Sequence, residues 1–190
     1  MFRAMDGGNC RIQEKAAASL NPSQVETALV QLSERWPEKA PLLVRVIEQF
    51  PLGETALLHL LAVSSTCATR LTRNPETLLW LCKPEVCLAS RGHAQMFHEL
   101  HAMADGSIAK QDFATLRLWK GAEMTRVALR ELANVAPLEE TTGELSLIAE
   151  ICIRGVFEHW NAEFRKRYGS PNAEFAILAL GKLGGGELNH

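Results

Sequence analysis

The sequence predicts a mainly α protein: a helical bundle, followed near the C-terminus by one strand and a glycine-rich turn. Two observations support this fold class. Helix start signals, in which a capping residue precedes proline, recur over residues 21–171 between apolar residues at helical spacing. Residues 172–190 instead carry a short, continuous apolar run that ends in glycines, which is typical of a buried strand and a turn.

The composition excludes several classes of protein. Of the 190 residues, 47% are hydrophobic, which is enough to bury a core. Lys and Arg number 20 against 22 Asp and Glu, so the net charge of −2 creates no general attraction to nucleic acid. No apolar run approaches the roughly 20 residues of a membrane-spanning helix, and the N-terminus lacks an export signal. Five scattered cysteines are typical of a reducing compartment, so we expect a cytoplasmic protein with free thiols.

The first helices are predicted from caps and prolines. Residues 1–20 lack apolar periodicity, and we expect them to form a flexible leader. The helical bundle is expected over residues 21–171. Asn21 and Pro22 start its first helix, which should run to about residue 36, and prolines on either side delimit a second helix over about 41–50.

The middle of the chain should contain four shorter helices. Residues 54–63 are apolar on most sides, which predicts a central, buried helix. A run of Ser and Thr can cap a helix that ends at residue 73, and Asn74 with Pro75 should start a short helix to residue 81. We expect a loop over residues 83–91, a helix over 92–103 and a turn over 105–107.

Two long helices should complete the bundle. The helix over about 111–134 has apolar residues on two sides, which predicts a position between neighbouring helices, with Glu123, Arg126 and Arg130 on the polar strip between these sides. The pattern of Thr141 with Glu144 is a capping box that predicts the start of the next helix. That helix should end near residue 167, in cations that suit a helix C-terminus.

The last segment carries the candidate ligand site. Residues 174–180 predict a buried strand, and Gly184 and Gly185 follow it closely enough for their N–H groups to approach phosphate oxygens, with Lys182 beside them. The spacing is neither a Walker nor a Rossmann pattern, so a plain tight turn remains an alternative. Since one strand needs a neighbour, we expect residues 172–190 to be the start of a truncated domain, frayed or paired with another chain.

Other charged and aromatic residues have less specific interpretations. Arg117, Arg126 and Arg130 are possible anion contacts, although such residues more often form ion pairs along a helix, for example Glu123 with Arg126. The histidines at positions 98 and 101 lack a metal-binding spacing, and we expect them to pack. The four tryptophans, one per helix, are expected to be core or interface anchors.

Three ordered stretches of this sequence resemble one enzyme family. Residues 175–189 read FAILALGKLGGGELN, which is similar to the nucleotidyltransferase signature of the glutamine synthetase adenylyltransferase/adenylyl-removing enzyme family. That family is a branch of the DNA polymerase β-like nucleotidyltransferases. Residues 116–146 resemble its arginine-rich helix and the capped helix that follows, and residues 62–75 resemble an element upstream of them.

The resemblance implies a function and its components. It implies transfer of AMP from ATP to a tyrosine of glutamine synthetase, or removal of that AMP by phosphorolysis, which regulates nitrogen metabolism. Mg2+ and ATP would be the cofactors of the full-length enzyme. Glutamine synthetase and a nitrogen-regulatory signal protein would be its partners. Gly184, Gly185 and Lys182 would contact the nucleotide, and the position of the glycine turn in the chain resembles the first, adenylyl-removing half of the family.

This sequence departs from the family pattern at the catalytic carboxylates. The family has an Asp-x-Asp pair a few residues beyond the glycine turn, and this sequence contains none. Gly186 also replaces a basic residue. We therefore assign no catalytic or metal-binding residue and expect the chain alone to be inactive, with no bound cofactor. The alternative is a non-catalytic helical module that binds a protein partner.

Overall fold

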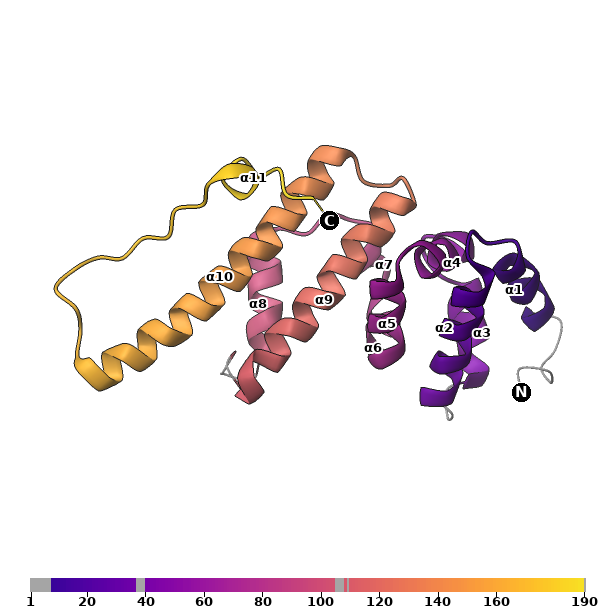
Figure 1. Cartoon of the computed structure of the whole chain (residues 1–190), viewed down its shortest axis with the longest axis horizontal. Coiled ribbons are helices and arrows are strands. Elements are labelled where there is room, and N and C mark those ends of the chain that lie inside the picture. The colour runs from indigo at the N-terminus through magenta and orange to yellow at the C-terminus, as the bar shows by residue number, and fades with distance from the viewer. Residues whose placement is uncertain (1–7, 37–39, 105–107, 109, 190) are drawn as a thin grey trace. The chain divides into compact units, whose positions relative to one another are not determined.

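The computed structural model describes residues 8–36, 40–104, 108 and 110–189, and the helices lie in the order shown in Figure 1. Their bounds are α1 Gly8–Ala17, α2 Pro22–Arg35, α3 Ala40–Glu48, α4 Glu54–Val63, α5 Ser65–Arg73, α6 Glu76–Leu81, α7 Pro84–Cys87, α8 His93–Met103, α9 Lys110–Leu132, α10 Leu138–Tyr168 and α11 Gly181–Gly184. No strand occurs in the part of the chain that is described. The mainly α class is confirmed.

The chain divides into two compact units, where the sequence suggested one bundle. Unit 1 comprises Met1–Ala89 and Ala128–Ala136, and unit 2 comprises Ser90–Val127 and Pro137–His190. Helix α9 therefore contributes residues to both units. The division falls across the helix, because its residues up to Val127 belong to unit 2 and those from Ala128 belong to unit 1. The apolar periodicity of the helix does not predict such a division.

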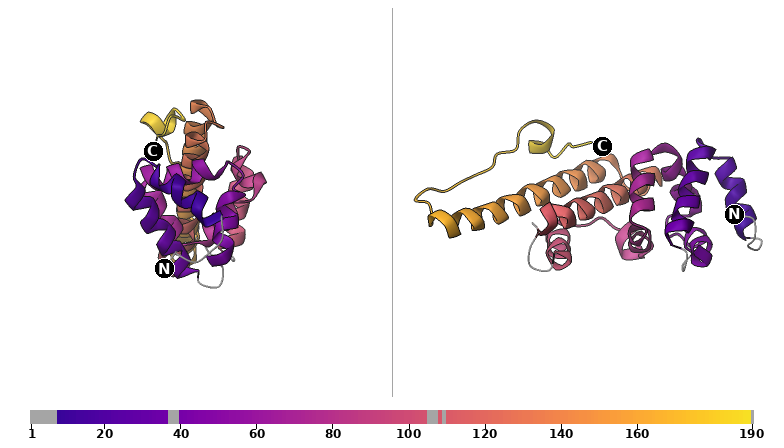
Figure 2. Two further views of the ribbon diagram at one scale, coloured as in Figure 1. Left: turned by 90° about the vertical axis from the view of Figure 1, so that its right-hand side faces the viewer. Right: turned by 60° about the horizontal axis from the view of Figure 1, so that its bottom comes forward.

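Unit 1 is a bundle around the apolar helix α4, and Figure 2 shows its helices from two further directions. The predicted caps are present: the Asn21 side chain accepts the Gln24 N–H at 3.3 Å, and Ser64 Oγ accepts the Cys67 N–H at 3.2 Å. Leu57, Leu60 and Leu61 are each at most 1% exposed, which confirms α4 as the buried helix. Cys67 and Cys87 are buried and are not joined to a disulfide partner among the described residues.

Two elements of unit 1 differ from the prediction. Residues 8–17, expected within the flexible leader, form α1, which buries Ile12 and Ala16. Two apolar residues make too weak a pattern to recognise, and α1 also pairs with Glu54 of α4 through Arg11 at 2.7 Å and through Lys15. The expected loop over 83–91 contains the short helix α7, which starts at a proline and buries Val86.

Unit 2 contains α8, the first part of α9, and α10, with α9 and α10 side by side (Figures 1 and 2). Its core residues come from all three helices and the connection before α9: Met96, Leu100, Ala104, Ile108, Leu116, Trp119, Val127, Leu145, Ile148 and Ile151. Trp119 is a core anchor as predicted, whereas Trp160 is 49% exposed. The turn predicted over 105–107 lies outside the described residues.

Helix α10 starts earlier than the capping box predicted. It begins at Leu138 after Pro137, and Glu139 and Glu140 lie in its first turn, where carboxylates interact favourably with the helix dipole. Thr141 is inside the helix and buried, and Glu144 bonds to groups outside α10. The predicted end is confirmed, because Gly169 adopts φ +80° just beyond Tyr168.

The strand predicted over residues 174–180 is not formed. The segment is irregular, with extended backbone at Leu180 (φ −122°, ψ 166°), because a strand forms only when its N–H and C=O groups pair with a neighbour. The predicted glycine turn contains the single-turn helix α11. None of the described helices is both long and apolar enough to cross a membrane.

Candidate functional site

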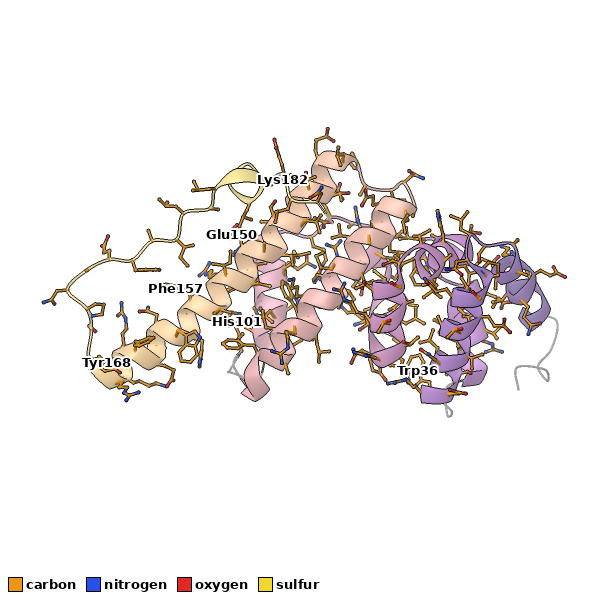
Figure 3. All side chains as sticks on the ribbon, viewed as in Figure 1. Trp36, His101, Glu150, Phe157, Tyr168 and Lys182 are labelled. Carbon is orange, nitrogen blue, oxygen red and sulfur yellow. The ribbon has the colours of Figure 1, made fainter. Side chains whose placement is uncertain are left out.

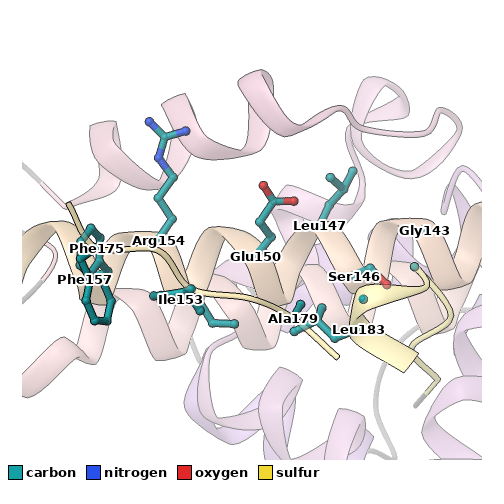
Figure 4. A pocket seen from close by; sticks show the side chains of 13 residues that line it. Gly143, Ser146, Leu147, Glu150, Ile153, Arg154, Phe157, Phe175, Ala179 and Leu183 are labelled. Carbon is teal, nitrogen blue, oxygen red and sulfur yellow. The ribbon is translucent and has the colours of Figure 1, made fainter. Parts of the chain in front are cut away.

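The candidate site is a groove in unit 2 between one face of α10 and the segment that returns along it (Figure 4). Its volume is about 670 Å³. The groove is lined by Gly143, Ser146, Leu147, Glu150, Ile153, Arg154, Phe157, Phe175, Ile177, Ala179, Leu183, Gly184 and Gly186. It therefore brings the predicted glycine turn against α10, which sequence reasoning did not foresee.

Helix α10 presents nearly opposite faces to the core and to this groove. At about 100° per residue, Glu144, Ile148 and Gly155 share one face, and all three are buried. Ser146, Glu150 and Phe157 lie about 160° away around the helix by the same arithmetic, and all three line the groove. Figure 3 shows Glu150 and Phe157 on the stretch of α10 beside the returning segment.

The returning segment alternates like a strand although it pairs with none. Phe175, Ile177 and Ala179 line the groove, and Phe175 stacks on Phe157 with ring centroids 5.2 Å apart. Leu178 and Leu180 point away from it and are each 84% exposed. A strand that carries apolar residues on both faces is typical of the interior of a sheet covered on both sides.

The glycine turn requires glycine at position 184. A Cβ there would lie 2.5 Å from the carbonyl oxygen of Ala179, which is closer than real Cβ contacts. The N–H groups of Gly185 and Gly186 donate within the turn, to Gly181 O at 3.0 Å and Leu183 O at 3.2 Å. In this conformation the turn is closed by its own hydrogen bonds.

Polar groups connect the groove to its surroundings. Ser146 Oγ accepts the Leu188 N–H at 3.5 Å, just after the glycine turn. Arg154 Nε donates to Glu158 Oε1 at 2.7 Å, and its guanidinium lies 4.4 Å from the centre of the Phe97 ring. Lys182 is exposed, and its Nζ donates to Asn189 Oδ1 at 3.3 Å. Among the predicted nucleotide contacts, Lys182 is therefore the side chain that a ligand in solution can reach.

The predicted anion contacts do not converge. Arg117 is exposed, whereas Arg126 and Arg130 are at most 2% exposed and belong to different units. Arg130 Nη1 donates to the Cys87 carbonyl oxygen at 3.4 Å within unit 1. The ion-pair interpretation is confirmed for Arg126, whose Nε donates to Glu123 Oε2 at 2.7 Å.

Arg126 belongs to a buried group that we call the ion cluster: Arg91, Glu99, Glu123, Arg126 and Glu144. Arg126 Nη2 donates to Glu144 Oε1 at 2.8 Å, and the same oxygen accepts the Arg91 backbone N–H at 2.8 Å. The Arg91 guanidinium donates to Glu123 and Glu99. The cluster therefore connects α9 and α10 to the residues around the start of α8.

Burial and charge act in opposite directions on the ion cluster. Burial raises the pKa of Glu123, against the lowering effect of Arg126 and Arg91. For Arg126, burial favours the neutral form, but Glu123 and Glu144 together hold its pKa above the ordinary value. Arg126 therefore stays charged, and the Glu123 carboxylate protonates more readily than an exposed glutamate does.

Sequence reasoning missed Arg91 and Glu144 as members of this cluster. The Arg91 N–H and the Glu144 carboxylate that accepts it are 53 residues apart in the chain, so no local pattern connects them. A signal did exist in α9, where Glu123 and Arg126 lie between two apolar sides, because charges enclosed in this way need buried partners.

Metal-binding groups are not brought together in the described residues. No set of three or more His, Cys, Asp or Glu side chains there could hold a metal ion. His101 packs as expected, because its Nδ1 lies 2.9 Å from the Phe97 carbonyl oxygen and its ring centroid lies 4.1 Å from that of Phe97. His98 is exposed, so the expectation that it packs was wrong.

Comparison with known proteins adds to this geometry. Residues 54–190 match the family described as glutamate-ammonia ligase adenylyltransferase. The bifunctional glutamine synthetase adenylyltransferase/adenylyl-removing enzyme of Shewanella oneidensis is 30% identical over 189 residues, covering 94% of this chain and 19% of that protein. The enzyme of the same name from Thioalkalivibrio sulfidiphilus is 29% identical over 188 residues, covering 92% of this chain and 19% of that protein. The chain thus spans about a fifth of these relatives' length, and no solved structure matches it.

Proposed function

The chain belongs to the glutamate-ammonia ligase adenylyltransferase family, and we propose that it is part of an enzyme that modifies glutamine synthetase. The enzyme would transfer AMP to a tyrosine of glutamine synthetase or remove it by phosphorolysis. The observation that carries this proposal is the family match over residues 54–190, which includes the glycine turn and the whole of α10. The relatives' names state both activities.

We place the nucleotide near the glycine turn. Gly184 lets the turn fold back against the Ala179 carbonyl, and Lys182 projects an ammonium group that can approach a phosphate. Because the N–H groups of Gly185 and Gly186 donate within the turn, they would have to leave their carbonyl partners before they could bind phosphate. Lys182 is thus the first contact that a phosphate would make.

The segment 174–180 would become a strand of a nucleotidyltransferase sheet. Its alternating apolar faces suit a strand covered on both sides, and its backbone groups can pair with neighbouring strands in a longer polypeptide. In that sheet Phe175, Ile177 and Ala179 would keep their places against α10. Leu178 and Leu180 would be buried on the other side of the sheet.

The described residues do not fit the Mg2+ ion that AMP transfer needs. Mg2+ prefers several oxygen ligands in octahedral geometry, and Glu150 is the only carboxylate that lines the groove in the described part of the chain. We therefore propose that other parts of the enzyme supply the metal ligands and that the 190-residue chain alone does not transfer AMP. Isothermal calorimetry with ATP and Mg2+ should detect no binding, and a micromolar Kd would contradict this proposal.

The activity is tested with a polypeptide of the relatives' full length that includes this chain. It is incubated with unmodified glutamine synthetase, ATP and Mg2+, or with adenylylated glutamine synthetase and inorganic phosphate. Mass spectrometry of glutamine synthetase should show AMP gained or lost on one tyrosine. No change in either reaction would refute the function.

A glycine variant tests whether the turn contributes. Gly184→Ala should lower the rate about 100-fold, because its Cβ would clash with Ala179 and displace the turn. Gly92→Ala is the matched control, since a Cβ there meets no atom within 4 Å. Equal rates for the two variants would exclude the turn from the active site.

The partners of the enzyme follow from the same proposal. Glutamine synthetase would be the substrate, and a nitrogen-regulatory signal protein would control the direction of the reaction. A second candidate function, a non-catalytic module that binds glutamine synthetase, is favoured by the exposed aromatic side chains of Trp160, Phe164 and Tyr168 on α10. Binding of the 190-residue chain to glutamine synthetase, with no activity in the longer polypeptide, would support this second function.

A further inference from the structure

We propose that the ion cluster positions the glycine turn, by fixing the rotation and the axial position of α10. The cluster lies on one face of α10, and the turn lies against another, so the helix itself connects them. The inference concerns the geometry of the turn, and its importance for catalysis rests on the proposed function.

Apolar packing alone would leave the register of α10 weakly determined. Leu145, Ile148 and Ile151 make contacts that depend little on direction, so another combination of apolar residues could fill the same core. Slipping α10 by one residue would turn its faces by about 100° and move them by about 1.5 Å along the axis. Directional bonds are needed to exclude such a slip.

Glu144 supplies those bonds from two directions. Its Oε1 accepts from Arg126 Nη2 of α9 and from the backbone N–H of Arg91, each at 2.8 Å. Arg126 is in turn held by Glu123 through a different nitrogen, Nε, at 2.7 Å. Since charged hydrogen bonds in a buried site are strong and sensitive to direction, a displaced Glu144 would lose both partners and leave buried charge uncompensated.

The residues next to Glu144 contact the turn. Gly143 and Ser146 both line the groove together with Gly184 and Gly186. Ser146 Oγ accepts the Leu188 N–H, and the Leu188 side chain packs against the core of unit 2. Gly143 and Ser146, which contact the glycine turn, therefore both lie within one turn of helix α10 from Glu144, the residue that the ion cluster holds.

The experiment measures the turn in the folded 190-residue chain by NMR, without nucleotide. Glu144→Gln keeps the shape of the side chain but removes its charge. Arg126→Lys keeps the charge but replaces two separated donors with one nitrogen. Glu158→Gln is the control, because Glu158 forms an exposed pair with Arg154 on the same helix, away from the cluster.

We expect Glu144→Gln and Arg126→Lys to shift the amide signals of Gly184, Gly185 and Gly186, and to speed hydrogen exchange at the Leu188 N–H several-fold. Core amides such as that of Leu100 should exchange more slowly than Leu188 in the same sample. Glu158→Gln should leave the signals of the turn in place.

Two results would overturn the inference. One is an unchanged turn in folded Glu144→Gln chain. The other is a uniform acceleration of exchange over core and turn alike, which would mean that the cluster only stabilises unit 2. If Arg126→Lys does not fold, the conservative Glu144→Gln variant still decides the question. A failure of AMP transfer in the longer polypeptide leaves this readout intact, so the two proposals can fail separately.

Discussion

The two units of this chain bury charge in different ways. In unit 1 the buried Glu54 pairs with Arg11 and Lys15, whose side chains are 66% and 36% exposed, and the buried Arg130 donates to a backbone carbonyl. In unit 2 the buried charged residues bond mainly to one another: Arg91, Glu123, Arg126 and Glu144 form one connected cluster, in which only Glu99 reaches the surface.

The two units differ in their apolar cores as well as in their buried charges. Unit 1 buries a large apolar cluster drawn mainly from α1 to α7, whereas the cluster of unit 2 is about half that size. A large apolar core stabilises many similar packings, while bonded charges select among them because each misplacement leaves a charge unpaired. The unit that positions the groove is the one that depends on bonded charge.

The largest expected effect comes from removing the centre of the ion cluster. Arg126→Met should lower the free energy of unfolding by about 3–5 kcal/mol, because it leaves Glu123 and Glu144 buried without a shared cation. Urea denaturation followed by circular dichroism measures the change. A loss below about 1 kcal/mol would mean that water compensates these carboxylates as it does at a surface.

Truncating the core of unit 1 should have a similar or slightly smaller effect. Leu60 is completely buried in α4, and Leu60→Ala should cost about 2–5 kcal/mol through lost contacts and a cavity. The control is Leu42→Ala, at a position that is 50% exposed. Equal losses in the two variants would contradict the assignment of α4 as the centre of unit 1.

A smaller change in the free energy of unfolding should depend on pH. Because burial raises the pKa of Glu123 in the folded chain, its contribution to stability is fully present at pH values below its unfolded pKa and is lost as pH rises through the higher folded pKa. Glu123→Gln removes this dependence. The stability of the natural chain relative to Glu123→Gln should therefore fall as the pH rises above about 4, the pKa of an unperturbed glutamate. A rise over the same range would show that Arg126 and Arg91 outweigh burial.

The smallest effect is expected at the surface of α10. Arg154→Met breaks the exposed pair with Glu158, in which both side chains are at least 41% exposed, and should cost less than about 1 kcal/mol. Thermal unfolding of this variant beside Arg126→Met sharpens the contrast between exposed and buried pairs. If Arg154→Met lowered the free energy of unfolding as much as Arg126→Met does, exposed and buried ion pairs would contribute equally to the stability of this chain.

Most helices could be predicted because their signals are local. Two helices start at side-chain caps, Asn21 and Ser64, which bond to backbone N–H groups three residues later. Helix α10 ends where Gly169 adopts a positive φ. Helix α1 could not be predicted in this way, since what stabilises it is packing and the carboxylate of Glu54, 43 residues from Arg11. The capping box at Thr141 was wrong for the same reason: Glu144 has stronger partners in Arg126 and Arg91.

The sequence by itself determined the helical class, most helix ends, the family and the need for glycine near position 184, because each depends on residues close together in the chain. Only the tertiary structure decided the division into two units, the ion cluster and the groove where α10 meets the glycine turn. These features depend on contacts such as Arg91 with Glu144 and Ser146 with Leu188. Contacts over such separations are selected by the packing of whole helices, which no local pattern records.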